Sequence, residues 1–242
     1  MKVAVITPYY REPLEVLRQA HDSVRAQRFT CRHVLIADGH PRPEIDGWEA
    51  DHITLPRAHG DIGSTPRLIG CIHAIGLGFD AVAFLDADNW LRRDHVGRLV
   101  RLARATGAGF VSSGRTLCRL DGSVLGPCTE TAPATFIDTN CMMFLRPAFP
   151  LLMTWVLMPG FAHLIGDRVI YQKVRHSGIV TAHDPAPTVN YRCGRRGSYK
   201  AFGERPPDGA VPSPDFRRAM RRWVRQGNPD LTTPQPDPPV IE

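Results

Sequence analysis

Apolar segments typical of strands alternate with amphipathic segments typical of helices along the first half of the chain. Val3–Ile6 is an apolar run, and Leu14, Leu17 and Val24 then fall on one face of a helix. His33–Ala37 has the pattern of a second strand. The first part of the chain therefore reads as strand, helix and strand.

The alternation continues to residue 85. Ile53–Leu55 is expected as a short strand, Leu68–Phe79 repeats apolar residues at helical spacing, and Ala81–Leu85 is another apolar strand. This order predicts an α/β fold with a mostly parallel central sheet flanked by helices. Ligands of such sheets bind beyond the carboxyl ends of the strands, so polar residues that follow the strands are the first candidates for a site.

The second half is less regular. We expect a helix over Val96–Ala103, strands at Phe110–Val111 and Thr135–Leu145, and helices over Pro147–Met158 and Asp167–Arg175. No simple strand-helix alternation links these segments, so the sequence predicts the elements here but not their order in the sheet.

The last part of the chain, 203–242, is rich in proline, glycine and charge. We expect an irregular tail that is extended or partly disordered. Residues 216–226 are the exception, because Met220 and Trp223 lie on an apolar helical face while arginines fill the other faces. This short basic amphipathic helix is a candidate for peripheral contact with an anionic membrane surface.

Two aspartates follow the strand that ends at Leu85. In "FLDADN" the carboxylates of Asp86 and Asp88 would repel each other unless a cation lies between them, and hard cations prefer oxygen ligands. Mg²⁺ or Mn²⁺ held here would leave coordination positions open for a diphosphate. The alternative is structural: Asp86 caps the following segment and Asp88 is solvated.

The turn after the first strand, Thr7–Glu12, contains no glycine. Dinucleotide-binding folds use a glycine-rich turn at this point to bring backbone amides to phosphate, and no phosphate-binding P-loop motif occurs elsewhere. The sequence thus argues against a dinucleotide-dependent dehydrogenase. A divalent cation would neutralise phosphate in place of the missing amides.

Composition restricts the partners and the compartment. The formal net charge of +6 suits an anionic small ligand, nucleic acid or an acidic membrane surface. Six cysteines without a C-x-x-C pair indicate buried free thiols in a reducing cytosol. With no apolar run of roughly 18–20 residues and no signal-peptide pattern, we expect a cytoplasmic protein, with residues 216–226 as a candidate peripheral contact at the inner membrane face.

Several ordered motifs together resemble inverting family 2 glycosyltransferases of the GT-A fold, from about Lys2 to Arg192. They are "VAVITPYYRE", "VLIADG", "GSTPRLIG", "FLDADN", "FIDTNCMMFLRPAF" and "GDRVIYQKV". The resemblance implies a single GT-A-type domain over 1–202, with a nucleotide-binding half at 1–90 and an acceptor half at 91–202. It also implies metal-dependent transfer of a sugar from a nucleoside-diphosphate sugar to an acceptor hydroxyl, with inversion.

The resemblance and the chemistry of the side chains together suggest roles for individual residues. Asp88 would hold Mn²⁺ or Mg²⁺, with Asp86 and His183 as further candidate ligands, and Arg67 would pair with phosphate or with Asp38. Asp61 is a weaker candidate in the loop before Arg67. The residues expected to contact the donor are Pro8, Tyr10, Asp38, Arg67, Asp86, Ala87, Asp88, Arg195 and Arg196.

Asp167 corresponds to the acid that serves as the general base in this family. The preceding position, often a second acid, is Gly166 here, and His163 is the alternative proton acceptor because an imidazole suits neutral pH. Ala37 stands where the family often has another acid, which leaves the nucleotide base open, although a UDP-sugar is the first choice of donor. The residues do not identify the acceptor.

Tyr191–Glu204 combines glycines with four basic residues. We expect a mobile loop that closes over the donor diphosphate. The alternative is a solvated basic linker leading to the helix at 216–226.

Two other functions fit parts of the sequence. A sugar-nucleotide nucleotidyltransferase shares this type of sheet, but it needs a glycine-rich basic loop after the first strand. A basic nucleic-acid-binding protein should show a charged stripe interleaved with exposed aromatic residues, whereas the arginines cluster after Arg192. We therefore expect a nucleotide-sugar partner and no nucleic acid.

Overall fold

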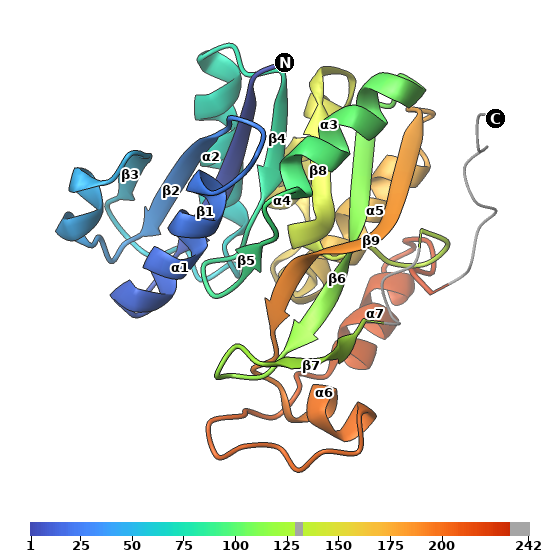
Figure 1. Ribbon diagram of the computed structural model, residues 1–242. Helices are drawn as coiled ribbons and strands as arrows, with labels where there is room; N and C mark the ends of the chain where they lie inside the picture. The colour runs from blue at the N-terminus through green and yellow to red at the C-terminus, as the bar shows by residue number, and fades with distance from the viewer. Residues whose placement is uncertain (129–132, 233–242) are drawn as a thin grey trace.

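The computed structural model describes residues 1–128 and 133–232. Its strands form one mixed sheet in the order β3-β2-β1-β4-β8-β6-β9-β5, with β7 added at β6, and helices lie against both faces of the sheet (Figure 1). The α/β fold expected from the sequence is confirmed, and the sheet is parallel in its first half and mixed in its second.

The first half has the predicted order. The strands β1, β2, β3 and β4 are all parallel, and the helices α1 and α2 connect them. β1 is paired with both β2 and β4, so its end lies between theirs. The bounds are β1 Val3–Tyr9, α1 Leu14–Arg25, β2 Arg32–Asp38, β3 Asp51–Leu55, α2 Ser64–Gly76 and β4 Ala81–Phe84.

The second half extends the same sheet with a change of direction. β8 is antiparallel to both β4 and β6, whereas β9 runs parallel to β6 with irregular register around Gly114. β9 was not predicted, because its sequence contains Pro185 and Pro187. The bounds are β5 Trp90–Leu91, α3 His95–Thr106, β6 Phe110–Cys118, β7 Val124–Pro127, β8 Met142–Leu145, α5 Gly166–Arg175 and β9 Thr181–Arg192.

Two predicted elements of this half are wrong in extent. The strand expected over Thr135–Leu145 is reduced to β8, because the Asp138 side chain accepts a bond from the Asn140 N–H and caps the short 3-10 helix η2, Thr139–Cys141. The helix expected over Pro147–Met158 is instead the 3-10 helix η3, Arg146–Met153, followed by α4, Thr154–Leu157. Pro147 and Pro150 lack backbone N–H donors, which disfavours a continuous α-helix.

The main core spans both halves, between the sheet and the helices on its two faces. Phe84, Phe144 and Phe110 stack edge to face across β4, β8 and β6, and Trp155 of α4 packs on Phe84. These rings belong to fully or almost fully buried side chains. They hold β4, and with it the polar residues that follow β4, in a rigid position.

The described part of the tail, 203–232, packs on the domain and is not detached from it. The helix α7, Phe216–Arg225, lies against the 3-10 helix η4, Gly160–Ile165. Ala219 and Trp223 are buried, so much of the apolar face of α7 is used inside the protein. This use weakens the expectation of a membrane contact through α7; residues 233–242 lie outside the described residues.

Candidate functional site

A cavity of about 570 Å³ opens where β1, β2 and β4 end, and we call it the Asp88 cavity. It brings together every residue that the sequence suggested for donor contact except Arg196. The lining residues are Pro8, Tyr9, Tyr10, Glu12, Asp38, Ala58, Gly60, Ile62, Gly63, Arg67, Asp86, Ala87, Asp88, Tyr191 and Arg195.

Asp86 is held on both carboxylate oxygens. Oδ1 accepts a hydrogen bond from Arg67 Nη2 at 2.5 Å, and Oδ2 accepts one from Asn140 Nδ2 at 2.9 Å. The Asp86 N–H donates back to Asn140 Oδ1 at 2.6 Å. Arg67 was expected to pair with phosphate or Asp38; in the structure its side chain extends from the first turn of α2 to Asp86, in the segment that follows β4.

Asp88 differs from Asp86 in having no cationic partner. Its side chain is exposed at the cavity, and it forms no ion pair within the described part of the chain. Desolvation by the surrounding protein raises the pKa of Asp88 to about 7, and the charges of Asp86 and Glu12 add to this effect. Arg192 lies nearby but donates to the Asp88 backbone carbonyl at 3.0 Å, not to the carboxylate.

Asp38 is fixed by a histidine that the sequence did not indicate. The nearly buried carboxylate accepts bonds from the His59 N–H at 3.1 Å and from His59 Nδ1 at 2.6 Å. The loop carrying His59 passes very close to Gly39, where a Cβ would lie 2.3 Å from the Ala58 nitrogen. Gly39, at φ 77°, is therefore required for this approach.

Tyr10 lies at the mouth of the cavity. The residue is 40% exposed, and its ring meets the His40 ring edge to face at 4.6 Å. The Arg11 guanidinium lies over the same ring at 4.9 Å. An exposed ring that is oriented by its neighbours is available for stacking on a planar ligand.

A buried polar network connects this cavity to the second half, and sequence reasoning missed it. Asn140 Nδ2 also donates to Asp138 Oδ1 at 2.8 Å, and Asp138 is paired with the buried guanidinium of Arg115. Arg115 in turn lies under the ring of Tyr191 at 4.3 Å. The available signal was "DTN", a polar triplet inside the apolar segment 136–145.

Asp167 lies in the first turn of α5, beside this network. Its carboxylate accepts from the Arg168 N–H at 2.7 Å. Burial raises the pKa of Asp167 to about 6, and the charge of Asp138 contributes in the same direction. Asp167 is adjacent to Asp138 but is not among the residues that line the Asp88 cavity.

Two other predicted residues have structural roles. Asp61 Oδ2 accepts from the Thr65 N–H at 2.8 Å and so caps the start of α2. His183 contacts Ser112 Oγ at 2.9 Å near the beginning of β9. Arg192, which contacts Asp88, lies at the far end of the same strand: His183 pairs with Ser112 of β6 and Arg192 with Cys118, a separation of roughly 20 Å at the rise of a β-strand. The structure therefore does not bring His183 to Asp86 and Asp88 as a metal ligand.

The two arginines of the predicted closing loop point in different directions. Arg195 lines the Asp88 cavity and also donates to the Pro212 carbonyl at 3.4 Å. Arg196 begins the short helix α6, Arg196–Ala201, and its Nε donates to the Ala210 carbonyl at 3.0 Å. Arg196 therefore binds the tail and does not face the cavity.

His163 lies outside the Asp88 cavity. Its Nδ1 contacts Ser64 Oγ at 2.9 Å, and the residue lines a neighbouring cavity.

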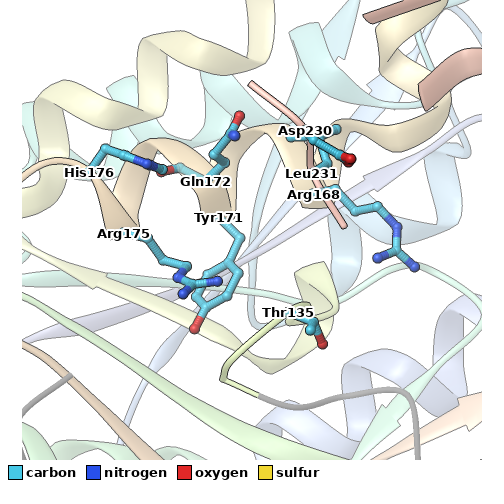
Figure 2. Close-up of a pocket in the computed structure, with 8 residues that line it drawn as sticks. All are labelled: Thr135, Arg168, Tyr171, Gln172, Arg175, His176, Asp230 and Leu231. Carbon is cyan, nitrogen blue, oxygen red and sulfur yellow. The ribbon is translucent and has the colours of Figure 1, made fainter. Parts of the chain in front are cut away.

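A different, small pocket lies between α5, Thr135 and the segment at Asp230 and Leu231 (Figure 2). Its volume is about 10 Å³. This volume is too small for any sugar nucleotide.

Two further properties concern the described residues as a whole. Among residues 1–128 and 133–232, no three histidine, cysteine or acidic side chains are grouped so as to hold a metal ion by themselves. In the same ranges, no helix has the length and apolar character needed to cross a bilayer.

Comparison with known proteins agrees with this geometry. The family model described as glycosyl transferase family 2 matches residues 4–149. No curated protein sequence matches the chain significantly. Among solved structures, S. aureus TarS 1-349 in complex with UDP superposes with a TM-score of 0.61 at 12% identity. The alignment covers 84% of this chain and 63% of that one, so the chain spans less than two thirds of the TarS fragment.

Two further structures of the same protein are similar. S. aureus TarS 1-349 in complex with UDP-GlcNAc gives a TM-score of 0.60 at 12% identity, covering 93% of this chain and 66% of that one. A longer S. aureus TarS structure gives a TM-score of 0.58 at 12% identity, and the alignment covers 83% of this chain and 38% of that one. At this level of identity the likeness concerns the fold, and the GT-A-type fold expected from the sequence is confirmed.

Proposed function

The chain belongs to glycosyl transferase family 2, and from this premise we propose that it transfers a sugar from a nucleoside-diphosphate sugar to an acceptor hydroxyl with inversion. The observation that carries the proposal is the Asp88 cavity. Its volume of about 570 Å³ suits a sugar nucleotide, and it lies at the carboxyl ends of parallel strands. UDP is the first nucleotide to test, because TarS of the same fold was solved with UDP and with UDP-GlcNAc.

A divalent cation, Mn²⁺ or Mg²⁺, fits the residues at Asp88. The carboxylate lacks a cationic partner among the described residues, and its raised pKa reflects desolvation first and the neighbouring negative charge of Asp86 second. Asp86 is already bonded through both oxygens, so Asp88 would supply the main protein ligand and the diphosphate and water the others. When bound, the cation would supply Lewis-acid stabilisation of the departing diphosphate.

The chain's own residues perform the remaining steps. Tyr10 stacks against the base, Asp38 accepts hydrogen bonds from it or from the ribose, and Arg195 approaches the phosphates. Asp167 removes the proton from the acceptor hydroxyl as that oxygen bonds to the anomeric carbon. The bond from this carbon to the diphosphate oxygen breaks, and the electron pair leaves with the diphosphate. Because the acceptor attacks opposite the leaving group, the anomeric configuration inverts.

Family membership favours this function over a nucleotidyltransferase or a nucleic-acid-binding protein. The direct test is calorimetric titration with UDP, GDP, ADP and CDP, each with and without Mn²⁺. We expect one nucleotide to bind clearly more tightly than the others, and only with Mn²⁺ present. Equal affinity for all four, or no change on adding Mn²⁺, would contradict the donor or the metal assignment, respectively.

A further inference from the structure

A second cavity, of about 470 Å³, opens beside the Asp88 cavity, and none of the steps above uses it. Gly60 and Ile62 line both cavities, so a single loop separates them. We call it the Arg218 cavity. Its lining residues are Gly60, Ile62, Gly160, Phe161, His163, Leu164, Asp215, Arg218, Ala219 and Arg222.

Ile62 lies between the two cavities, and its backbone is strained. Ile62 has φ 57°, a left-handed conformation that β-branched residues rarely adopt. Its carbonyl accepts from Arg67 Nη1 at 3.1 Å, while the other terminal nitrogen of Arg67 holds Asp86. The Ile62 side chain is 60% exposed. Arg67 therefore holds both Asp86 of the D-x-D motif and the Ile62 backbone between the cavities. A strained backbone like that of Ile62 is typical of functional sites.

Two arginine side chains in the lining of the Arg218 cavity have no acidic partner among the described residues. Arg218 and Arg222 lie one turn apart on α7, and within the described residues neither guanidinium forms an ion pair. Arg222 is oriented by the Phe161 ring, 4.2 Å away. The acid in the lining, Asp215, caps α7 by accepting from the Arg218 N–H at 2.8 Å. The cavity is thus positively charged and partly aromatic.

We propose that the Arg218 cavity binds the acceptor, and that the acceptor carries an anionic group, a phosphate or a carboxylate, which Arg218 and Arg222 hold. Planar guanidinium groups bind both types of oxyanion with paired hydrogen bonds. The rest of the acceptor would lie on Phe161 and Ile62, next to the donor across the shared wall. This inference rests on the proposed transfer, because it assigns the second substrate of that reaction.

The test is an NMR titration of the labelled full chain, with and without saturating UDP and Mn²⁺. The probes are glucose 1-phosphate, glucuronate and glucose, which separate a phosphate, a carboxylate and a neutral sugar. We expect at least one anionic probe to bind in the presence of UDP, to shift the resonances of His163 and Phe161, and to bind at least about tenfold more tightly than glucose.

Variants of α7 make the test specific. The double variant Arg218→Gln, Arg222→Gln should weaken the anionic probe about tenfold. The matched control is Arg217→Gln, Arg221→Gln, which removes the same charge from positions that do not line the cavity. We expect the control to bind the probe like the wild type.

Three results would overturn the inference: glucose binding as tightly as the anions, equal weakening in both double variants, or displacement of the probe by UDP. A failure of the proposed function has a separate signature. In that case UDP would leave the Asp88 cavity resonances unchanged, whereas the anion titration without UDP would still report on the Arg218 cavity.

Discussion

The two halves of the sheet supply different parts of the site in different ways. In the first half, parallel strands end side by side, and residues at or just past these ends, such as Asp38 and Asp86, enter the cavity because of where the strands stop. In the second half, Asn140 and Asp138 come from a 3-10 turn, and Tyr191 from the end of a long irregular strand. The first half thus places its polar groups by regular geometry, and the second half by side-chain hydrogen bonds.

Asn140 connects the polar groups of the two halves of the sheet. Asn140 bonds to Asp86 on one side and to Asp138 on the other, and Asp167 is adjacent to Asp138. Asp86 of the D-x-D motif is therefore connected through a single buried amide to Asp138, whose charge acts on the proposed base. Four predictions test this division of the site, from the largest expected effect to the smallest.

The first prediction separates chemistry from donor binding. Asp167→Asn should lower the rate of transfer by about 10²–10⁴-fold, the usual contribution of a general base, while leaving nucleotide affinity within about twofold. The measurements are nucleoside diphosphate release and calorimetry. His163→Asn is the matched comparison: if it loses transfer and Asp167→Asn does not, the base lies in the Arg218 cavity.

The second prediction breaks the link between the halves. Asn140→Ala removes the side-chain bonds to Asp86 and Asp138 and leaves the Asp86 N–H and Oδ2 without this partner, so the free energy of unfolding should fall by about 1–3 kcal/mol. Transfer should fall by about 10–100-fold, because both carboxylates lose a positioning contact. Thr139→Ala, in the same turn, is the control. Retention of full transfer in Asn140→Ala would mean that the two halves act independently.

The same contrast explains what the sequence predicted. Strand ends in the first half follow from apolar periodicity, so Pro8, Asp38 and Asp86 were correctly expected near one another. His59 and Asn140 were missed, because a histidine in a loop or an asparagine in an apolar segment carries no periodic signal. His183 was expected at the metal without a prediction of the strand that carries it, and in the structure His183 lies at the opposite end of β9 from Arg192, which contacts Asp88.

Prolines caused the remaining errors. The apolar segment at Pro147–Met158 has helical periodicity, yet Pro147 and Pro150 convert its first part to a 3-10 helix. Outside the helix expected at 216–226, the tail was expected to be extended or partly disordered because of its composition, although Leu231 joins the main core together with Trp223 of that helix. Composition describes a segment in isolation, whereas burial depends on a surface provided by the rest of the chain.

The third prediction concerns the pH dependence of transfer. Asp167 must be deprotonated to accept a proton, and its pKa is raised to about 6. The rate under saturating donor should therefore increase as the pH rises, with a midpoint near 6 and about a tenfold gain between pH 5 and pH 7. A plot of rate against pH checks this, with the protein's circular dichroism recorded at each pH. The residual activity of Asp167→Asn should lack this midpoint; a shared midpoint would assign the ionisation to another group.

The fourth prediction compares the stability of the halves in acid. Each half contains a buried neutral histidine: His33 contacts Thr7 Oγ1 at 2.8 Å, and His95 contacts Thr188 Oγ1 at 2.7 Å. Burial lowers the pKa of His95 to about 4 and holds the pKa of His33 well below its usual range.

In the unfolded chain each histidine binds a proton near pH 6.5, whereas in the folded chain it stays neutral. The contribution of each neutral histidine to the free energy of unfolding is therefore fully present above pH 6.5 and is lost as the pH falls toward 4. Protonation of His95 should cost about 2 kcal/mol at pH 5 relative to pH 7, and His33 should act in the same direction. Urea unfolding at the two pH values, for wild type, His33→Gln and His95→Gln, measures this. Each variant should lose part of the pH dependence, and a variant that retains all of it would show that its histidine is not the group being protonated.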